Sequence, residues 1–330
     1  MAVAGGAHWP MPTRRQWLTA ALGVPFGVPV GILASAALGV PATPARAAPV
    51  GPSARFDRGL LWRVSPARPR GAAASHLYGT LHIDDAAAKA FAPPVRAALR
   101  AARRFMPELR SDPESGRAFL AATQLPPGQS LRAIAGDTLF ARVAELLGQH
   151  HGLPPRAADR LKPWAAYLQL SQPTQPPGET VDAALERLAR QQGKPVEPLE
   201  ELQAQIDALE ALPAGSQWAL LEGLSRLHAE AMAGIARLSA LYLDQDLAGL
   251  LDQERAIGVG EPTLLSALDD LLEHLVHRRS EAMAGRLAGP LQAGGAFVAV
   301  GALHLQGPRG LPSLLAQAGW RVERVAWRKG

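Results

Sequence analysis

A short apolar run that ends in a glycine and is followed by a histidine occurs twice, once near each end of the chain. The first copy carries Gly79 and His82, and the second carries Gly301 and His304. An apolar run of this length predicts a buried strand, and a glycine at its end allows the backbone to turn tightly and expose the imidazole. We therefore expect two halves of the fold to meet at one site, with one histidine from each half.

The rest of the chain predicts strands at both ends and helices in the middle. Strand-like runs lie at residues 60–64, 75–82, 103–109, 196–199, 297–300 and 320–326. Helical patterns occupy residues 84–104, 114–170, 179–192, 217–251, 262–287 and 311–318, another helix begins near Glu200, and a Pro/Gln-rich loop lies at 172–178. The layout predicts an α/β fold, with α+β as the alternative, in which a large helical subdomain at about 114–290 is inserted between the two related halves.

The first 47 residues have the pattern of an export signal. Arg14 and Arg15 precede an uncharged apolar run at residues 19–40, and a small-x-small cleavage site ends at Ala47. This pattern predicts a twin-arginine signal cleaved near Ala47, so that residues 48–330 form a single periplasmic or secreted domain. An ordinary secretory signal and an uncleaved anchor are the alternatives. The prolines and glycines of the apolar run disfavour a stable membrane helix.

Charge and cysteine content narrow the classes of function. Without the first 47 residues the chain holds 31 basic residues (34 in the whole chain less Arg14, Arg15 and Arg46) against 29 acidic ones, a net charge of about +2. Such a balance gives no excess of basic residues of the kind that binds nucleic acid. The chain has no cysteine, which excludes disulfides, a lipid-modified cysteine anchor and thiolate chemistry. Metal ligands must therefore be His, Asp or Glu, and a nucleophile must be a hydroxyl, a carboxylate or water.

The two repeated units predict a metal site. A histidine just past the carboxyl end of a buried strand lies where open α/β sheets place ligands. His82 and His304, together with a carboxylate from a neighbouring strand, would make a two-histidine, one-carboxylate site with open positions for water. Glu108, at the end of a predicted short strand, is that carboxylate, as a ligand or as a base. The alternative is that both histidines occupy turns without any chemical role.

The other histidines and the serines are weaker candidates for metal ligands or nucleophiles. His150 and His151 end a helical run and precede a glycine, as in a solvated helix end, and His274 and His277 lie among charged residues on one helix face. No serine lies in the G-x-S-x-G pattern of a nucleophile elbow, which disfavours a serine hydrolase.

Two charged residues further along the chain have open roles. Glu200 lies where a predicted strand meets a predicted helix, so it either points into the same cleft or complements the helix N-terminus. Arg279 either binds an acidic group or lies on the solvent-exposed face of its helix. The sequence leaves both alternatives open for each residue.

Beyond the two histidine units, several short motifs occur in an order and spacing that resemble the TraB/GumN family, which includes the TIKI-type proteins. The resemblance spans roughly residues 60–325. Its landmarks are Leu77–His82, Glu108, Lys162-Pro163-Trp164, Val181-Asp182 with Leu185, Gly193–Val196 leading to Leu199-Glu200, and Val300–Leu311 followed by Leu314-Leu315 and Gly319.

The resemblance implies an α/β fold whose two halves bring both histidine units to one cleft. For TIKI-type members it implies metal-dependent hydrolysis of peptide bonds, with a metal-bound water as the nucleophile. By that analogy, His82 and His304 are ligands and Glu108 is the third ligand or the acid/base. Arg279 matches an arginine usual in the family and would stabilise a developing oxyanion, with Glu200 as a further catalytic candidate.

The sequence departs from the family pattern at three positions. Ser280 stands where the family pattern has an asparagine after the arginine, Glu201 stands where a threonine commonly follows the glutamate, and Pro107 directly precedes Glu108. These departures affect the roles expected of Glu108, Glu200 and Arg279 more than the role of the two histidines as ligands.

We compare three hypotheses for the function. The first is an envelope metallohydrolase that uses manganese, cobalt or zinc and acts on a peptide or a small-molecule amide. The second is a non-catalytic haem- or metal-binding envelope protein, for which Tyr78 or a histidine would be the axial haem ligand. The third is an interaction protein linked to exopolysaccharide production, whose helical middle does the work and in which His82 and His304 are both replaceable.

Overall fold

The computed structural model describes residues 56–67, 73–173 and 178–327. The predicted export signal at residues 1–47 and most of the predicted loop at 172–178 therefore lie outside the described residues. In these ranges, no helix combines the length and the apolar character that a membrane crossing requires.

One mixed sheet organises the described part of the chain. Its five strands are β1 (Leu61–Pro66), β2 (Ser75–Thr80), β3 (Arg104–Pro107), β4 (Ala296–Gly301) and β5 (Trp320–Arg324). Their order is β3-β4-β2-β1-β5, where β3, β4 and β2 run parallel and β1 pairs antiparallel with both β2 and β5. A mixed sheet with three adjacent parallel strands, together with many helices, confirms the predicted α/β fold class.

The helices occupy the long middle of the chain and its C-terminal part. They are α2 (Ala86–Lys89), α3 (Pro93–Ala101), α4 (Pro113–Ala122), α5 (Leu131–Ala135), α6 (Asp137–His151), α7 (Pro155–Ala158), α8 (Pro163–Leu170), α9 (Val181–Gln191), α10 (Leu202–Glu210), α11 (Ala214–Arg226), α12 (His228–Ala233), α13 (Ile235–Leu243), α14 (Leu247–Arg255), α15 (Pro262–Leu272), α16 (Arg278–Ala293) and α17 (Leu311–Gln317). Three shorter turns are the 3₁₀ helices η2 (Ala256–Gly258) and η4 (Ala302–Leu305) and the π-helical turn η3 (Glu273–His277).

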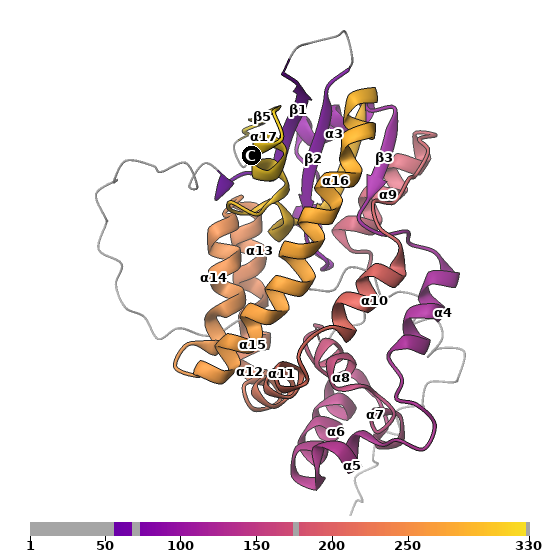
Figure 1. The fold of residues 1–330 in the computed structure, drawn as a ribbon, viewed down its shortest axis with the longest axis vertical. Helices are drawn as coiled ribbons and strands as arrows, with labels where there is room; N and C mark the ends of the chain where they lie inside the picture. The colour runs from indigo at the N-terminus through magenta and orange to yellow at the C-terminus, as the bar shows by residue number, and fades with distance from the viewer. Residues whose placement is uncertain (1–55, 68–72, 174–177, 328–330) are drawn as a thin grey trace, which may run out of the picture.

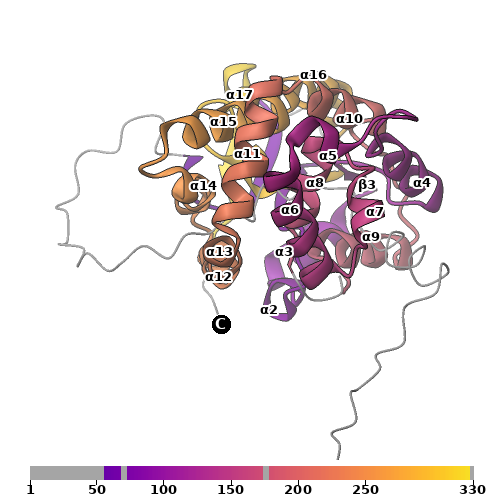
Figure 2. The same ribbon diagram turned by 90° about the horizontal axis from the view of Figure 1, so that it is seen from below.

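Helices cover both faces of the sheet. In Figures 1 and 2, α16 and α17 lie on one side of the strands and α3 and α9 lie on the other. The central strands β2 and β4 are accordingly almost wholly buried, as their apolar composition requires. The core between these layers includes Trp62, Phe105 and Phe297, each at most 1% exposed.

A second apolar core fills the helical region in the lower part of Figure 1. It is built largely from α6, α8, α11 and α15, with Trp164 and Leu147 among its fully buried side chains. Helices α9 and α16 instead pack into the core around the sheet. The helical middle of the chain is thus shared between two cores.

The two histidine units follow neighbouring parallel strands, β2 and β4. Thr80 pairs with Gly301 at the end of both strands, and Pro107 at the end of β3 pairs with Ala299. Three carboxyl ends therefore lie at the same edge of the sheet. β3 is an edge strand of the sheet, as the proline at position 107 predicts. Pro107 therefore removes no backbone hydrogen bond from the interior of the sheet.

The two motif glycines do not make the sharp turn that we expected, and Gly79 serves close packing instead. Neither Gly79 nor Gly301 has a positive φ, and Gly301 has φ −52° and ψ 138°, which other residues adopt readily. A β-carbon on Gly79 would lie 2.9 Å from Leu305 Cδ1 and 3.1 Å from Ala302 Cα. Gly79 is therefore needed because the turn after β4 packs directly on β2.

Two predicted elements differ from the structure because of proline. The helix predicted at 84–104 is split into α2, which Asp85 caps, and α3; Phe91 between them has φ 38° and is followed by two prolines at the start of α3. The strand predicted at 196–199 is only an isolated bridge between Val196 and Phe105. Pro198 cannot donate a hydrogen bond there.

The long predicted helices are also divided differently. Residues 217–251 contain parts of four helices, with Gly234 and Gln245 at breaks between them. The stretch predicted at 262–287 runs on to Ala293 and contains the π-helical turn η3. A π turn adds one residue to a helix and is frequent at functional sites.

Candidate metal and hydrolytic site

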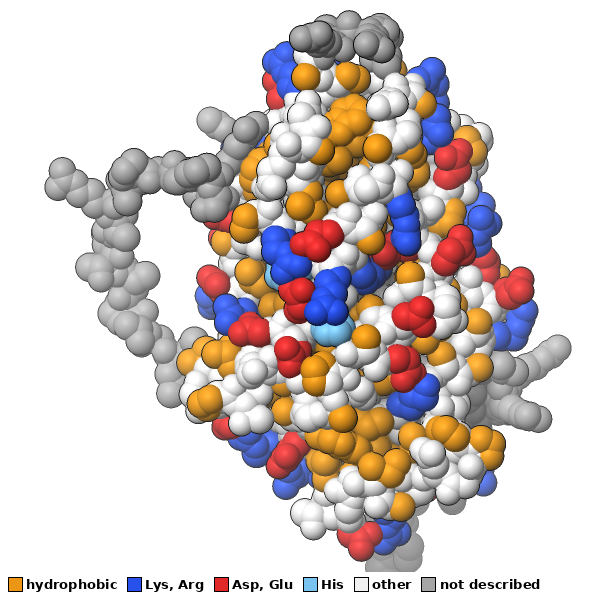
Figure 3. Space-filling model, viewed as in Figure 1, with side chains coloured by type: hydrophobic (Ala, Val, Ile, Leu, Met, Phe, Trp, Pro, Cys, Tyr) orange, Lys and Arg blue, Asp and Glu red, His pale blue; other side chains and the backbone are white. Residues whose placement is uncertain are grey.

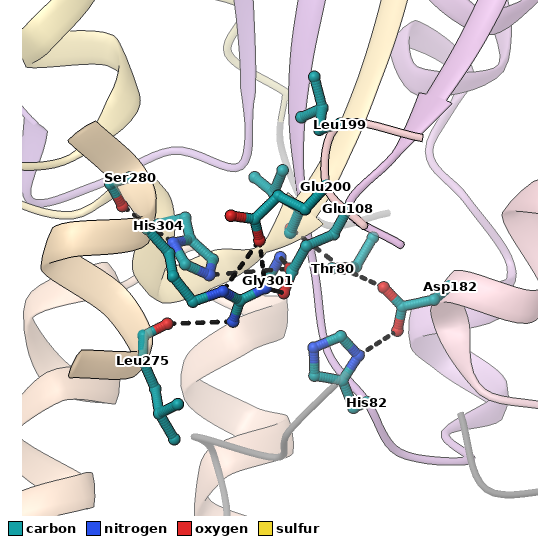
Figure 4. A network of polar contacts seen from close by, with 12 residues as sticks. Thr80, His82, Glu108, Asp182, Leu199, Glu200, Leu275, Ser280, Gly301 and His304 are labelled. Carbon is teal, nitrogen blue, oxygen red and sulfur yellow. Dashed lines mark hydrogen bonds and ion pairs between the residues drawn. The ribbon is translucent and has the colours of Figure 1, made fainter. Parts of the chain in front are cut away.

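His82, Glu108 and His304 converge beside Gly301, at the carboxyl edge of the three parallel strands (Figure 4). A β-carbon placed on Gly301 would lie 3.4 Å from His82 Nε2, 3.5 Å from His304 Cδ2 and 3.6 Å from Glu108 Oε2. The hydrogen-only side chain of Gly301 therefore leaves a small space that all three groups border. The structure thus brings together the three residues that we predicted from sequence as metal ligands.

His82 is held by a carboxylate from α9. Its Nδ1 lies 2.7 Å from Asp182 Oδ2, and Asp182 Oδ1 accepts a hydrogen bond from the Thr80 hydroxyl. Burial alone would lower the pKa of His82, but the adjacent Asp182 carboxylate outweighs burial, and the pKa is raised. A carboxylate on Nδ1 fixes the ring and directs Nε2 away from Asp182.

His304 is held by a hydroxyl from α16. It lies in the turn η4 with 4% exposure, and its Nδ1 is 2.9 Å from Ser280 Oγ, which is fully buried. His304 Nε2 lies 3.7 Å from Glu108 Oε2. The serine at the position where the family pattern has asparagine thus retains a polar contact with the second histidine.

Glu108 lies just past the end of β3 with both carboxylate oxygens engaged. Its Oε1 accepts a hydrogen bond from Arg279 Nη2 (2.5 Å), and its Oε2 accepts one from the Gly301 backbone N–H (2.9 Å). Burial would raise the pKa of Glu108, but the Arg279 guanidinium and the two histidines together outweigh burial and hold the pKa well below its ordinary value. Glu108 is therefore an ionised carboxylate, which suits a ligand or electrostatic role better than that of a base.

Arg279 joins two buried carboxylates. Its Nε and Nη2 donate to Glu200 Oε2 at 2.9 and 2.6 Å, while Nη1 donates to the Leu275 carbonyl at 3.1 Å. Arg279 and Ser280 are adjacent in sequence, and both side chains are buried at the start of α16, directly after the π-helical turn. This one turn therefore supplies the partners of both Glu108 and His304.

A cleft opens beside this cluster. It is open to solvent and is bordered by His82, Glu108 and Asp182. An apolar wall that includes Phe105 and Leu109 faces them. His304 is not among the lining residues, so it lies behind Glu108 as seen from the cleft.

The donor chemistry fits a divalent metal, although the three donors stand too far apart to share an ion without moving. Both imidazoles are held through Nδ1, and the space that a β-carbon on Gly301 would fill is bordered by two rings and a carboxylate. Within residues 56–67, 73–173 and 178–327, no three His, Asp or Glu side chains are close enough to hold a metal in their present positions. An ion at this place would have to bring the three groups closer.

Comparison with known proteins assigns the family. The profile of the TraB/PrgY/gumN family matches residues 60–324, which include every strand of the sheet and all the residues of the site. The chain belongs to the TraB/PrgY/gumN family. Comparisons with curated proteins and with solved structures gave no match.

Two partners of the histidines in this TraB/PrgY/gumN protein were not predicted as site residues. Asp182 belongs to a family landmark to which the sequence assigns no role, and Ser280 is a departure from the family pattern. Glu200 is 3% exposed, accepts hydrogen bonds from Arg279 and does not line the cleft. Lys162 and Trp164, another landmark, contact Glu210 in the helical region and are not part of the site.

Tyr78 is not placed to bind a haem in this TraB/PrgY/gumN protein. Its hydroxyl accepts a hydrogen bond from Tyr242 (3.0 Å), it is 3% exposed, and it does not line the cleft. Burial raises the pKa of Tyr78 to about 12, against the effect of the Tyr242 hydrogen bond. The hydroxyl therefore stays protonated and structural.

A cluster of other histidines lies in the helical region. The rings of His150 and His228 are 4.4 Å apart, and Nε2 of His228 and Nε2 of His151 are buried without a hydrogen-bond partner. Burial, followed by His228 and His150, lowers the pKa of His151 to about 4. His150 and His151 thus belong to a partly buried cluster and not to the solvated helix end that we predicted.

We expect this cluster to weaken the fold in mild acid. Because the pKa of His151 is lower in the folded than in the unfolded chain, the unfolded chain binds more protons below pH 6.5. Stability falls as pH decreases from about 6.5 to about 4, by at most about 1.4 kcal/mol per pH unit for this proton. Urea unfolding at pH 7.5 and 5 should show a shallower fall in His151→Gln than in the wild type. Gln149→Ala, exposed on the same helix, should keep the wild-type slope, and equal slopes in all three would contradict the prediction.

Proposed function

We propose that this protein is a metal-dependent hydrolase that cleaves a peptide or amide bond in the cell envelope. His82, His304 and Glu108 would hold manganese, cobalt or zinc. The observation that carries the proposal is the convergence of these three side chains beside Gly301, with each imidazole held through Nδ1 by another side chain. The envelope location rests on the pattern of residues 1–47 alone.

A divalent ion in this place would act as a Lewis acid on the substrate carbonyl and lower the pKa of water. The residues of the chain divide the remaining tasks. Asp182 orients His82, Ser280 orients His304, and Arg279 keeps Glu108 ionised. A substrate would lie in the cleft, against Phe105 and Leu109, with its reacting bond at the end where His82 and Glu108 border the opening.

The face of the molecule on which α16 lies has no large field of one charge. Basic and acidic side chains are interspersed across the face in Figure 3 and do not form one large field of either sign. Many are paired, as where Arg309 contacts both Glu273 and Glu281. Such a face offers little long-range attraction to a highly charged polymer.

Metal content of the purified protein tests the proposal. We expect close to one first-row metal per chain in the wild type and none in the His82→Ala/His304→Ala double variant, because imidazole is the dominant ligand type. His76→Ala is the matched control, since His76 is at the opposite end of β2 from the site and should leave the metal content unchanged. Thermal melting of each variant checks that the loss is not due to unfolding.

The outcomes separate the three hypotheses. A wild type that holds no metal even after addition of manganese, cobalt or zinc would overturn the proposal. Metal that is lost in the double variant, without cleavage of any member of a peptide library, would indicate a binding protein without turnover. A double variant that retains full biological activity would favour the interaction protein.

A further inference from the structure

We propose that Glu200 is a positioning residue, which acts through Arg279 to hold the Glu108 carboxylate against the Gly301 amide and toward the two histidines. The value of this role for catalysis rests on the proposed function. The role of Glu200 in orienting Glu108 does not depend on the proposed function.

The Arg279 guanidinium is held by hydrogen bonds to neighbouring residues. All three of its nitrogens already donate, to Glu200, to Glu108 and to the Leu275 carbonyl, and its side chain is 6% exposed. These bonds use four of the five N–H groups of Arg279, and the side chain lies outside the cleft lining. Arg279 is therefore better placed to hold the two carboxylates than to stabilise the developing oxyanion that the family resemblance implies.

Glu200 and Glu108 are held side by side by the backbone. The Glu200 N–H donates to the Glu108 carbonyl at 3.0 Å, and Leu199 N–H donates to the Pro107 carbonyl at 2.9 Å. Residues 196–200 thus run beside β3 and end level with it. This pairing places two carboxylates on the same guanidinium, one on each side.

The second carboxylate would be unnecessary if charge balance were the only requirement. Arg279 alone neutralises Glu108, and burying Glu200 at 3% exposure adds a desolvation cost. Arg286, 3.6 Å away and half-exposed, offsets only part of that charge. The burial of Glu200 is therefore better explained by geometry.

The geometric role follows from how arginine binds carboxylates. An unrestrained guanidinium prefers to fork onto both oxygens of one carboxylate. Here Glu200 Oε2 accepts from Nε and Nη2, and the Leu275 carbonyl accepts from Nη1, so that Arg279 reaches only Oε1 of Glu108. Glu108 Oε2 is left to accept from Gly301 N–H and to face His304 Nε2. Without Glu200, we expect Arg279 to pull both Glu108 oxygens toward itself.

Hydrogen exchange of the Gly301 amide tests this in the metal-free protein. In Glu200→Ala, we expect the Gly301 amide to exchange about tenfold faster or more, as loss of a hydrogen bond to a charged group predicts. The amide of Val298, in the same strand, should keep its wild-type rate. Glu200→Gln retains an acceptor oxygen for Arg279 and should stay within about threefold of the wild type.

Glu197→Ala is the matched control, because Glu197 is on the same segment but half-exposed and paired with Arg104. Glu197→Ala should leave the exchange rates of the Gly301 and Val298 amides unchanged. Unchanged Gly301 exchange in Glu200→Ala would overturn the proposal. An equal rise at Gly301 and Val298 would also overturn it, since that result indicates general destabilisation.

Cobalt affinity gives a second readout. Loss of a residue that orients a ligand typically weakens metal binding about 10- to 100-fold, so we expect a loss of this size in Glu200→Ala and none in Glu197→Ala. Wild-type cobalt affinity in a Glu200→Ala protein whose wild type binds cobalt would count against the positioning role. A wild type without cobalt affinity would refute the proposed function, and the exchange of Gly301 would still decide the role of Glu200.

Discussion

Gly301→Ala is expected to abolish metal binding and leave the protein folded. The new methyl group would lie 3.4–3.6 Å from His82 Nε2, His304 Cδ2 and Glu108 Oε2, at ordinary contact distance, and the backbone at Gly301 already has a conformation that alanine accepts. No neighbour has to move for the chain to fold. The methyl group nevertheless occupies the space on which the three donors converge.

Cobalt titration and thermal melting together test this expectation. Gly301→Ala should show no stoichiometric cobalt binding, with a melting temperature within a few degrees of the wild type. Gly285→Ala is the control, because its β-carbon would contact nothing and it lies within α16. There alanine should add up to about 1 kcal/mol of stability and leave cobalt binding intact. Wild-type cobalt affinity in Gly301→Ala would show that the ion is bound elsewhere.

Arg279→Met should destabilise the fold by about 3–5 kcal/mol at neutral pH. Methionine fills a similar volume but leaves two buried carboxylates, Glu108 and Glu200, without their shared cation. In the wild type, the depressed pKa of Glu108 contributes stability above pH 4.5 that is lost as pH falls through the lowered value. The variant lacks this contribution, so its deficit should narrow in acid as the carboxylates bind protons.

Urea unfolding at pH 7.5 and pH 4.5 measures both effects. Adding Glu200→Gln to Arg279→Met should restore part of the stability, since one of the two uncompensated charges is then removed. Arg278→Met is the control: Arg278 precedes Arg279, is exposed, and pairs only at the surface with Glu273. It should cost less than about 1 kcal/mol. A neutral-pH deficit for Arg279→Met as small as that of Arg278→Met would contradict the buried-network interpretation.

The framework of the site could be predicted from sequence because it is local. A strand, a glycine and a histidine three residues later are within one short window, and Pro107 indicated an edge strand. The partners of the histidines could not be predicted in this way. Asp182 reaches His82 across 100 residues, and Ser280 reaches His304 from another helix, so these contacts depend on how the helices pack.

The glycines show the same limit. The sequence indicates where a glycine occurs but not whether it serves an unusual φ or a close contact. Gly79 and Gly301 were predicted to allow turns, but neither has a positive φ. Gly79 instead serves a close contact, and Gly301 leaves a space at ordinary contact distance from the two histidines and Glu108. The break at Phe91 and the π-helical turn likewise arise where local helical preference gives way to packing.

The position of β4 between β2 and β3 has a consequence for biosynthesis. A ribosome completes the first two parallel strands early, yet each pairs with β4 and not with the other, and β4 is made only after residue 295. A nascent or truncated chain that stops before β4 therefore has no paired parallel strands, and Glu108 and His82 have no common neighbour to bring them together. The site therefore comes into existence only after β4 has been made.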